Sequence, residues 1–183
     1  MKPGSRILGI DDSPFEKGSG ASVLVVGVLM RGPVVEGVLS TFVDSDGDDA
    51  TDRISEMILR SRFSTEVRAV MLNSIMMAGF NVVDISELSR RTGVPVIAVM
   101  RRKPDMGKVG AALANVCCTE EKMVRIKRAG NAIRIGRVYA QFAGTDAKGA
   151  AGMLSQYKGV PEPVRLAHVI AGGIMKGESS GKA

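Results

Sequence analysis

The sequence contains few aromatic residues and few cysteines. Its 183 residues include no Trp, two Tyr and five Phe, which is 4% aromatic. A surface that stacks the bases of single strands needs exposed rings, so this composition gives such a platform poor support. The only two cysteines, Cys117 and Cys118, are adjacent. Neighbouring Cα atoms lie about 3.8 Å apart, too close for an unstrained disulfide, and we expect two reduced thiols.

The chain also lacks a long apolar run. None reaches the roughly 18–20 residues that a membrane helix needs, so we expect no membrane partner and a cytoplasmic location. Hydrophobic residues make up 45% and charged residues 24% of the chain, which is ordinary for a globular protein. The formal net charge is +6, and this excess is compatible with an anionic partner such as DNA or RNA without requiring one.

Strand-like and helix-like segments alternate along the chain. The predicted strands are 6–10, 23–30, 34–43, 67–72, 94–100 and 132–144. The predicted helices are 51–61, 81–93, 106–116 and 119–130, followed by two more helical segments. A three-stranded opening followed by helix, strand, helix and strand is the order of the ribonuclease H-like fold. We therefore expect a single α/β domain over residues 1–183, with a mixed sheet and helices on both faces.

Two adjacent carboxylates, Asp11 and Asp12, end the first predicted strand in the sequence GIDDSPF. Ionised groups there need a cation, hydrogen bonds or water to compensate them. Side chains alternate across a strand, so the two acids point to opposite faces if the strand continues through Asp12. Gly9 is expected to leave open space beside Asp11, which suits a hard cation such as Mg²⁺ or Mn²⁺. In the alternative, the acids cap a turn that Pro14 makes rigid.

A second acidic segment, DSDGDDATD, covers residues 44–52. It is no EF-hand, because its glycine stands at loop position four and Ser55 occupies position twelve, where calcium binding needs a glutamate. A solvated loop before a helix N-terminus is favoured, since acids there complement the helix dipole. In the alternative, Asp46, Asp48 or Asp49 supplies ligands to a metal site.

Further polar candidates flank the predicted strands. Asn81 and Asp84, at the start of helix 81–93, either cap that helix or face a site at the carboxyl ends of the strands. A basic run that directly follows strand 94–100 could neutralise phosphates, although from the residues alone a solvated charge run is favoured. That run is Arg101, Arg102 and Lys103.

Two helix faces carry further charge. Lys122, Arg125 and Arg128 form the basic face of an amphipathic helix, for which solvation is favoured. The remaining face combines Glu162, Arg165 and His168 at i+3 spacing. A lone histidine is more often a structural hydrogen-bond partner, but beside Glu and Arg it suits a phosphate or metal-water contact. This face supports an alternative function, an enzyme acting on a small phosphorylated ligand.

Segments in chain order carry a family resemblance. They are RILGIDDSPF, VVGVLMRG, EGVLSTFVDSDGDDATDRI, AGFNVVDISELSRRTGVPVIAVMRRKPD and GVPEPVRLAHVIAGGIMKGESSGKA. Together they resemble an archaeal uncharacterised family, domain-of-unknown-function family ninety-nine, which is related to endonuclease V and shares its ribonuclease H-like fold. Endonuclease V-like enzymes cleave nucleic acid near deaminated bases with Mg²⁺.

The resemblance makes Asp11, in GID, the first-strand aspartate of the site. It implies Asp11, Asp12 and Asp49 as catalytic acids and Asp11 and Asp49 as ligands of Mg²⁺ or Mn²⁺. A further aspartate is expected after the later core strand, where VMLN places Asn73 instead. The resemblance implies a protein that binds a divalent metal and nucleic acid. Whether its Mg-dependent nuclease activity is retained, weakened or lost stays open. A non-catalytic binding or assembly module and a homo-oligomer stay open.

Overall fold

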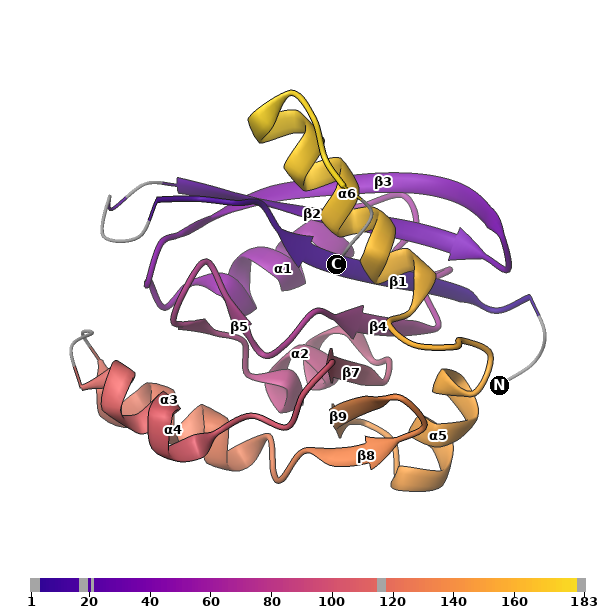
Figure 1. Cartoon of the computed structure of the whole chain (residues 1–183). Helices are drawn as coiled ribbons and strands as arrows, with labels where there is room; N and C mark the ends of the chain where they lie inside the picture. The colour runs from indigo at the N-terminus through magenta and orange to yellow at the C-terminus, as the bar shows by residue number, and fades with distance from the viewer. Residues whose placement is uncertain (1–3, 17–19, 21, 115–117, 181–183) are drawn as a thin grey trace.

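The computed structural model describes residues 4–16, 20, 22–114 and 118–180, and a mixed sheet forms its centre (Figure 1). The strands are β1 (Arg6–Asp12), β2 (Ser22–Arg31), β3 (Val34–Asp44), β4 (Ala69–Leu72), β5 (Met76–Met77), β6 (Asn81–Val82), β7 (Val96–Met100), β8 (Ile133–Ile135) and β9 (Val138–Ala143). The helices are α1 (Ala50–Leu59), α2 (Ile85–Thr92), α3 (Met106–Leu113), α4 (Thr119–Arg128), α5 (Ala147–Leu154) and α6 (Glu162–Lys176).

The large sheet has the strand order β3-β2-β1-β4-β7-β9-β8, and β5 and β6 form a separate small ribbon. The three central strands β1, β4 and β7 run parallel, whereas β2, β3, β8 and β9 pair antiparallel. Carboxyl ends of parallel strands meet at one edge of a sheet, so residues that follow β1 and β4 become neighbours. The predicted mixed α/β architecture is confirmed.

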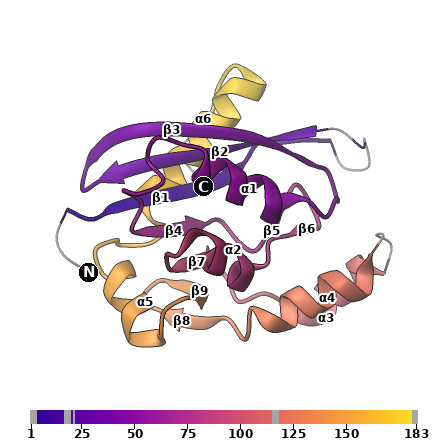
Figure 2. The same cartoon turned by 180° about the vertical axis from the view of Figure 1, so that it is seen from behind.

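Helices cover both faces of the sheet, as Figures 1 and 2 show from opposite sides. On one face, α1 and α2 bury Ile54, Ile58 and Leu88 against β1, β2 and β4. On the other, α5 and the start of α6 cover β4, β7 and β9, and α6 continues over β2 through Ala167 and Ala171. The alternation of side chains along β1 divides its residues between these two faces.

Gly9 has the opposite role from the one expected. A Cβ at this position would lie 2.2 Å from the backbone carbon of Pro163 and 2.3 Å from the nitrogen of Val164. The expectation of open space beside Asp11 is therefore wrong, because the first turn of α6 fills that space. The missing side chain instead allows a helix backbone to lie directly on the sheet.

Two predicted elements have different limits in the structure. The predicted helix 81–93 is a short strand, β6, followed by α2, which begins only at Ile85. Asp84 is the N-cap of α2 and accepts hydrogen bonds from the backbone of Ser86 and Glu87. The single predicted strand 132–144 is a hairpin of β8 and β9 that turns at Gly136, whose φ is +60°.

Two expectations from composition are tested only in part. Cys118 is exposed, and Cys117 lies outside the described residues. Over the described ranges, no helix combines the length and apolar character needed to cross a bilayer.

Replacing Gly9 with Ala tests the contact between α6 and β1. The added methyl group overlaps backbone atoms that cannot move independently, so we expect a loss of about 3 kcal/mol in the free energy of unfolding. Gly173→Ala in α6 is the matched control. Nothing lies within 4 Å of its Cβ position, and the better helix propensity of Ala should leave stability equal or raise it by up to about 1 kcal/mol. Equal denaturant midpoints for the two variants would contradict this packing.

Candidate active site

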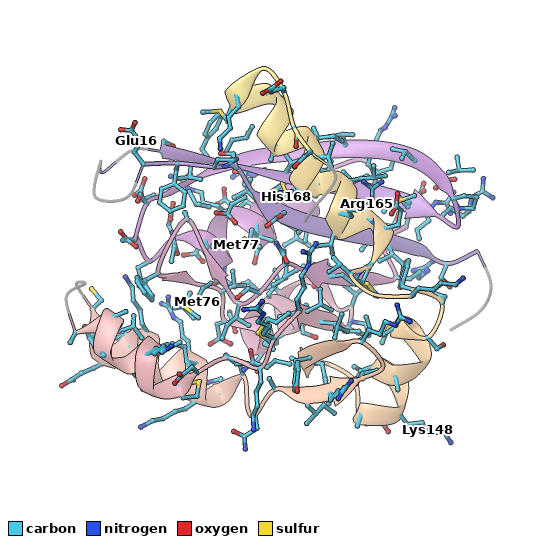
Figure 3. All side chains as sticks on the ribbon, viewed as in Figure 1. Glu16, Met76, Met77, Lys148, Arg165 and His168 are labelled. Atoms are coloured by element: carbon cyan, nitrogen blue, oxygen red, sulfur yellow. The ribbon has the colours of Figure 1, made fainter. Side chains whose placement is uncertain are left out.

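Two side chains from distant parts of the chain contact one carboxyl oxygen, Oδ2 of Asp11. Asn73 directly follows β4, and its Nδ2 donates to this oxygen at 3.0 Å. His168 brings its Nδ1 within 2.9 Å of the same oxygen, although it lies 157 positions away in the chain. Figure 3 shows His168 on α6, where that helix crosses the sheet. We call these residues the Asp11–Asn73–His168 cluster.

Regular geometry explains why these residues meet. The backbone N–H of Asn73 donates to the carbonyl of Ile10 at 3.1 Å, which extends the β1–β4 pairing to the strand ends. Val164 lies over Gly9, and four helical residues advance by about 6.0 Å. Two strand residues advance by about 6.6 Å. His168 lies four residues beyond Val164 on α6, and Asp11 lies two residues beyond Gly9 on β1. Because these two advances are similar, His168 lies over Asp11 as Val164 lies over Gly9.

The cluster centres on a buried carboxyl group, with Asn73 and His168 half-buried beside it. Asp11 is only 2% exposed. Burial, followed by the negative charge of Asp12, raises the pKa of Asp11 to about 8, against the opposing hydrogen bond from Asn73. Burial also raises the pKa of Asp12, although the backbone N–H of Ala78 donates to its carboxylate at 2.9 Å. A cation bound here would favour the ionised form of both acids.

Asp12 interacts with Asp11 and also with a second partner. Because β1 continues through Asp12, the two side chains leave the strand on opposite faces, but their carboxyl groups still interact at the end of the strand. Asp12 meets the β5–β6 segment through Ala78, whose carbonyl accepts from the backbone of Asp46 at 2.8 Å. Asp46 in turn accepts from the N–H of Phe80 at 2.8 Å. Asp12 and Asp46 therefore organise the acidic loop rather than the α6 face.

Asp49 and Asn81 form a separate network at the start of α1. Asn81 donates to Asp49 at 2.7 Å, and its amide oxygen accepts from the N–H of Ala50 at 3.0 Å. Asn81 therefore caps α1 instead of the helix it was expected to begin. Burial opposes ionisation of Asp49, but hydrogen bonds from Asn81 and the backbone of Asp44 outweigh it and hold the pKa of Asp49 below its ordinary value. No hydrogen bond among the described residues joins Asp49 to the cluster.

The basic face of α4 is paired rather than solvated, so that expectation is wrong. Arg125 binds both carboxylate oxygens of Asp48, at 2.5 and 3.0 Å. Arg128 pairs with Asp84. Lys122 is fully buried and its Nζ donates to the carbonyl oxygen of Asp46 at 2.6 Å. The i+3 spacing of the three bases was visible in the sequence. The acidic segment 44–52 was the signal for the partners of Lys122 and Arg125, whereas the partner of Arg128, Asp84, lies outside it.

The other predicted binding residues lie apart from the cluster. Arg165 pairs with Glu162 at 2.8 Å, so only His168 of that face reaches Asp11, and Figure 3 shows Arg165 one turn earlier on α6. The basic run after β7 is exposed at the carboxyl edge of the sheet, two strands from β1. It consists of Arg101, Arg102 and Lys103.

The cluster fits a hydrated divalent cation better than a cage of protein ligands. Within the part of the chain that the structure describes, no group of three or more His, Cys, Asp or Glu side chains is arranged to hold a metal. Mg²⁺ commonly keeps several waters and binds through one or two carboxylates. Asp11 is such a carboxylate. Asn73 can present its amide oxygen by rotating the amide, and a nitrogen of His168 lies beside them.

The fold agrees with the comparisons to known proteins. A family model described as Endonuclease dU matches residues 3–175. The chain belongs to the Endonuclease dU family. A UPF0215 protein of Methanothermobacter thermautotrophicus is 45% identical, over 100% of this chain and 94% of the relative. A UPF0215 protein of Methanopyrus kandleri is 44% identical, over 100% and 98%.

Solved structures show the same architecture. A protein of unknown function from Archaeoglobus fulgidus is 40% identical, with a TM-score of 0.87 over 93% of this chain and 98% of that one. Human ENDOV is 15% identical, with a TM-score of 0.57 over 90% and 81%. Endonuclease V of Ciona intestinalis, in complex with DNA containing an inosine, is 14% identical, with a TM-score of 0.56 over 90% and 83%. The predicted ribonuclease H-like fold, and with it the structural similarity to endonuclease V, is confirmed.

Replacing Asp11 with Asn should stabilise the metal-free protein. Because the pKa of Asp11 is raised from 3.8 to about 8, the folded state binds a proton that the unfolded state releases, and wild-type stability falls as the pH rises through this window. The amide keeps the shape and removes the charge. We expect the melting temperature of D11N to exceed that of wild type by at least about 3 °C at pH 8, with the gain vanishing near pH 4.

The matched control is Asp52→Asn, because Asp52 is an exposed acid on α1. It should change the melting temperature little at either pH. A D11N variant that is less stable than wild type at pH 8 in EDTA would contradict the raised pKa of Asp11.

Proposed function

We propose that this protein binds DNA and a divalent cation at the Asp11–Asn73–His168 cluster and hydrolyses a phosphodiester bond near a deaminated base. The observation that carries the proposal is the convergence of a buried carboxylate, an amide and a histidine at the carboxyl ends of two parallel strands. The family description, Endonuclease dU, and the inosine-containing DNA in the Ciona complex support this class of substrate.

The pairing of His168 with Asp11 gives the histidine a defined role. A carboxylate that contacts Nδ1 fixes the orientation and tautomer of the ring. The Nε2 atom can then exchange a proton with a phosphate oxygen or a water molecule. His168 also lines a hollow of about 450 Å³, where a phosphate group has access to the ring.

Asp11 and Asn73 would hold the cation, with His168 beside them. When bound, Mg²⁺ or Mn²⁺ supplies charge to a phosphoryl oxygen and lowers the pKa of a bound water. Asp11 would bind the ion and keep His168 in place, and Asn73 would orient the Asp11 carboxylate through its amide. Asp49 is left out of this role because its oxygens accept hydrogen bonds from Asn81 and from the backbone of Asp44.

Binding without cleavage is the second candidate function, and Asn73 is the observation that favours it. A neutral amide stands beside Asp11 where a second carboxylate would bind a cation more strongly. A site with one carboxylate fewer attracts divalent ions less and gives a two-metal arrangement less support. The protein would then recognise damaged nucleic acid through the same surface without cutting it.

Cleavage assays on DNA duplexes with one deoxyuridine, one inosine or no modified base separate the two functions. We expect Mg²⁺- or Mn²⁺-dependent cleavage near the modified base, reduced at least about 100-fold in D11A and in H168A. Mn²⁺ should also raise the melting temperature of wild type but not of D11A. R165A is the matched control on α6 and should keep wild-type activity.

The outcomes are distinct. Metal-independent binding of the modified duplexes without cleavage would support the binding function. Cleavage that is equal in wild type and D11A, or metal stabilisation that survives in D11A, would overturn the proposal.

The basic run after β7 should contact the DNA backbone. If Arg101 and Arg102 each neutralise one phosphate, the double variant R101A/R102A should bind more weakly to every duplex. The slope of log K against log salt should fall by about 2. Lys148→Ala is the control, since Figure 3 places Lys148 on α5, far from His168. Fluorescence anisotropy titrations from low to high salt measure the affinity and the salt slope of each variant. A slope of R101A/R102A equal to that of wild type would contradict this contact.

A further inference from the structure

The strand β3 is a long free edge of the sheet. It stands at one end of the strand order and spans 11 residues, whereas β8 at the other end has only three. Short strands and positively charged side chains protect sheet edges from pairing with other chains. β8 is short and carries the exposed Arg134, but β3 contains no proline, lysine or arginine. Its length and composition therefore leave β3 open to pairing with another strand.

The hydrogen bonds of the neighbouring strands show which backbone groups of β3 point outward. The N–H of Ser13 donates to the carbonyl of Leu24, so the backbone groups of Leu24 and of every second residue after it point toward β1. The partners of these β2 residues on β3 are Val38, Ser40 and Phe42. Their N–H and C=O groups therefore point away from the sheet, and no hydrogen bond among the described residues reaches them.

Two features confine the free part of this edge to residues 38–42. The N–H of Asp44 is already used, because it donates to Oδ1 of Asp49 in the same chain at 3.1 Å. Before residue 37, a bulge at Glu36 interrupts the regular pairing with β2. Ser40 is therefore the centre of the free edge.

An antiparallel two-fold axis at Ser40 makes this edge its own complement. Val38 of each copy would then lie opposite Phe42 of the other, and the two Ser40 residues would face each other. Each of these three pairs exchanges two backbone hydrogen bonds, about six in all. Val38 and Phe42 are 50% and 54% exposed, and a β-branched side chain opposite an aromatic ring is a favourable cross-strand pair. The small serine avoids a clash between identical side chains at the axis.

The carboxyl end of α6 offers a second contact across the same axis. Leu166 and Ile170 pack against β2, whereas Ile174, one turn later on the same stripe, is 63% exposed. Figures 1 and 2 show this end of α6 projecting past β3. Val38 lies on the α6 face of the sheet, since its neighbour Val28 packs against α6. A second β3 added at the edge would bring its exposed apolar face under the projecting helix.

The opposite face of the sheet carries complementary charges near the axis. Glu56 and Arg60, at the end of α1, line a hollow of about 300 Å³ together with Ser40. Both side chains are exposed, and their closest oxygen and nitrogen atoms are 3.8 Å apart. The two-fold axis brings two such pairs together, so that Glu56 of one copy faces Arg60 of the other. This complementarity favours a second copy of the chain over an unrelated partner.

We propose that this protein forms a two-fold dimer in which β3 pairs antiparallel with β3 of a second copy, centred on Ser40. The sheet would then continue through both copies. The two β1 strands run in opposite directions in such a sheet, so the two Asp11–Asn73–His168 clusters open at opposite edges. Dimer formation does not require the proposed activity.

Light scattering after size exclusion, in EDTA and without DNA, tests the pairing. At about 100 µM, wild type should have twice the mass of one chain. Ser40→Pro removes an outward N–H while the pairing with β2 stays intact, and Phe42→Lys places a charge opposite Val38 of the second copy. Both variants should have the mass of one chain. Val124→Lys, the same kind of change at an exposed apolar site on α4, should remain a dimer.

Each outcome decides the proposal. A wild type with the mass of one chain overturns it, and so does a dimer that persists in S40P or in F42K. F42K leaves the backbone unchanged and decides the test if the proline disturbs folding, which far-UV circular dichroism detects. Because no DNA or metal is present, a protein that dimerises through β3 but cleaves no duplex supports this interface and overturns only the hydrolytic activity.

Discussion

The direct contact of the α6 backbone with β1 at Gly9 is the constraint on which the site depends. The side chains between a helix and a sheet normally keep the two backbones apart. Here the absence of one Cβ lets the backbone of α6 lie against the backbone of β1. Only at this close approach does a histidine one turn further along reach a carboxylate two residues further along the strand. One glycine therefore sets the position of the reactive groups.

A second set of interactions joins α4 to the acidic loop and to the start of α2. Arg125 and Arg128 bind Asp48 and Asp84, and Lys122 donates to the loop backbone. These acids are therefore paired with arginines, whereas the partners of Asp11 are an amide and a histidine. The contrast explains why a chain with many acids near the strand ends has one principal candidate for a metal-binding carboxylate. Structural acids and the candidate functional acid differ in their partners rather than in their sequence context.

Much of the fold could be predicted from the sequence, because strand runs and helical periodicity are local signals. The order of strands and helices, the opposite orientation of Asp11 and Asp12, and the cap at Asp84 follow from such patterns. The limits of α2 and the β8–β9 hairpin do not, because short turns at Val83 and Gly136 interrupt segments of favourable composition. The site was harder to predict. His168 and Asp11 were both candidates, but their contact depends on tertiary packing across 157 positions.

The same packing explains an apparent conflict between stability and function. A buried carboxyl group whose pKa is raised to about 8 is a poor choice for folding alone, since folding at neutral pH must protonate a group that is ionised in the unfolded chain. An amide at position 11 would avoid that cost, with Asn73 rotating its own amide so that it accepts instead of donates. A carboxylate at this position is useful only to a ligand that carries positive charge, or to a histidine that must be held and charged during a reaction. The cluster thus has the property expected of a binding or catalytic centre, in which local destabilisation is compensated when the ligand binds.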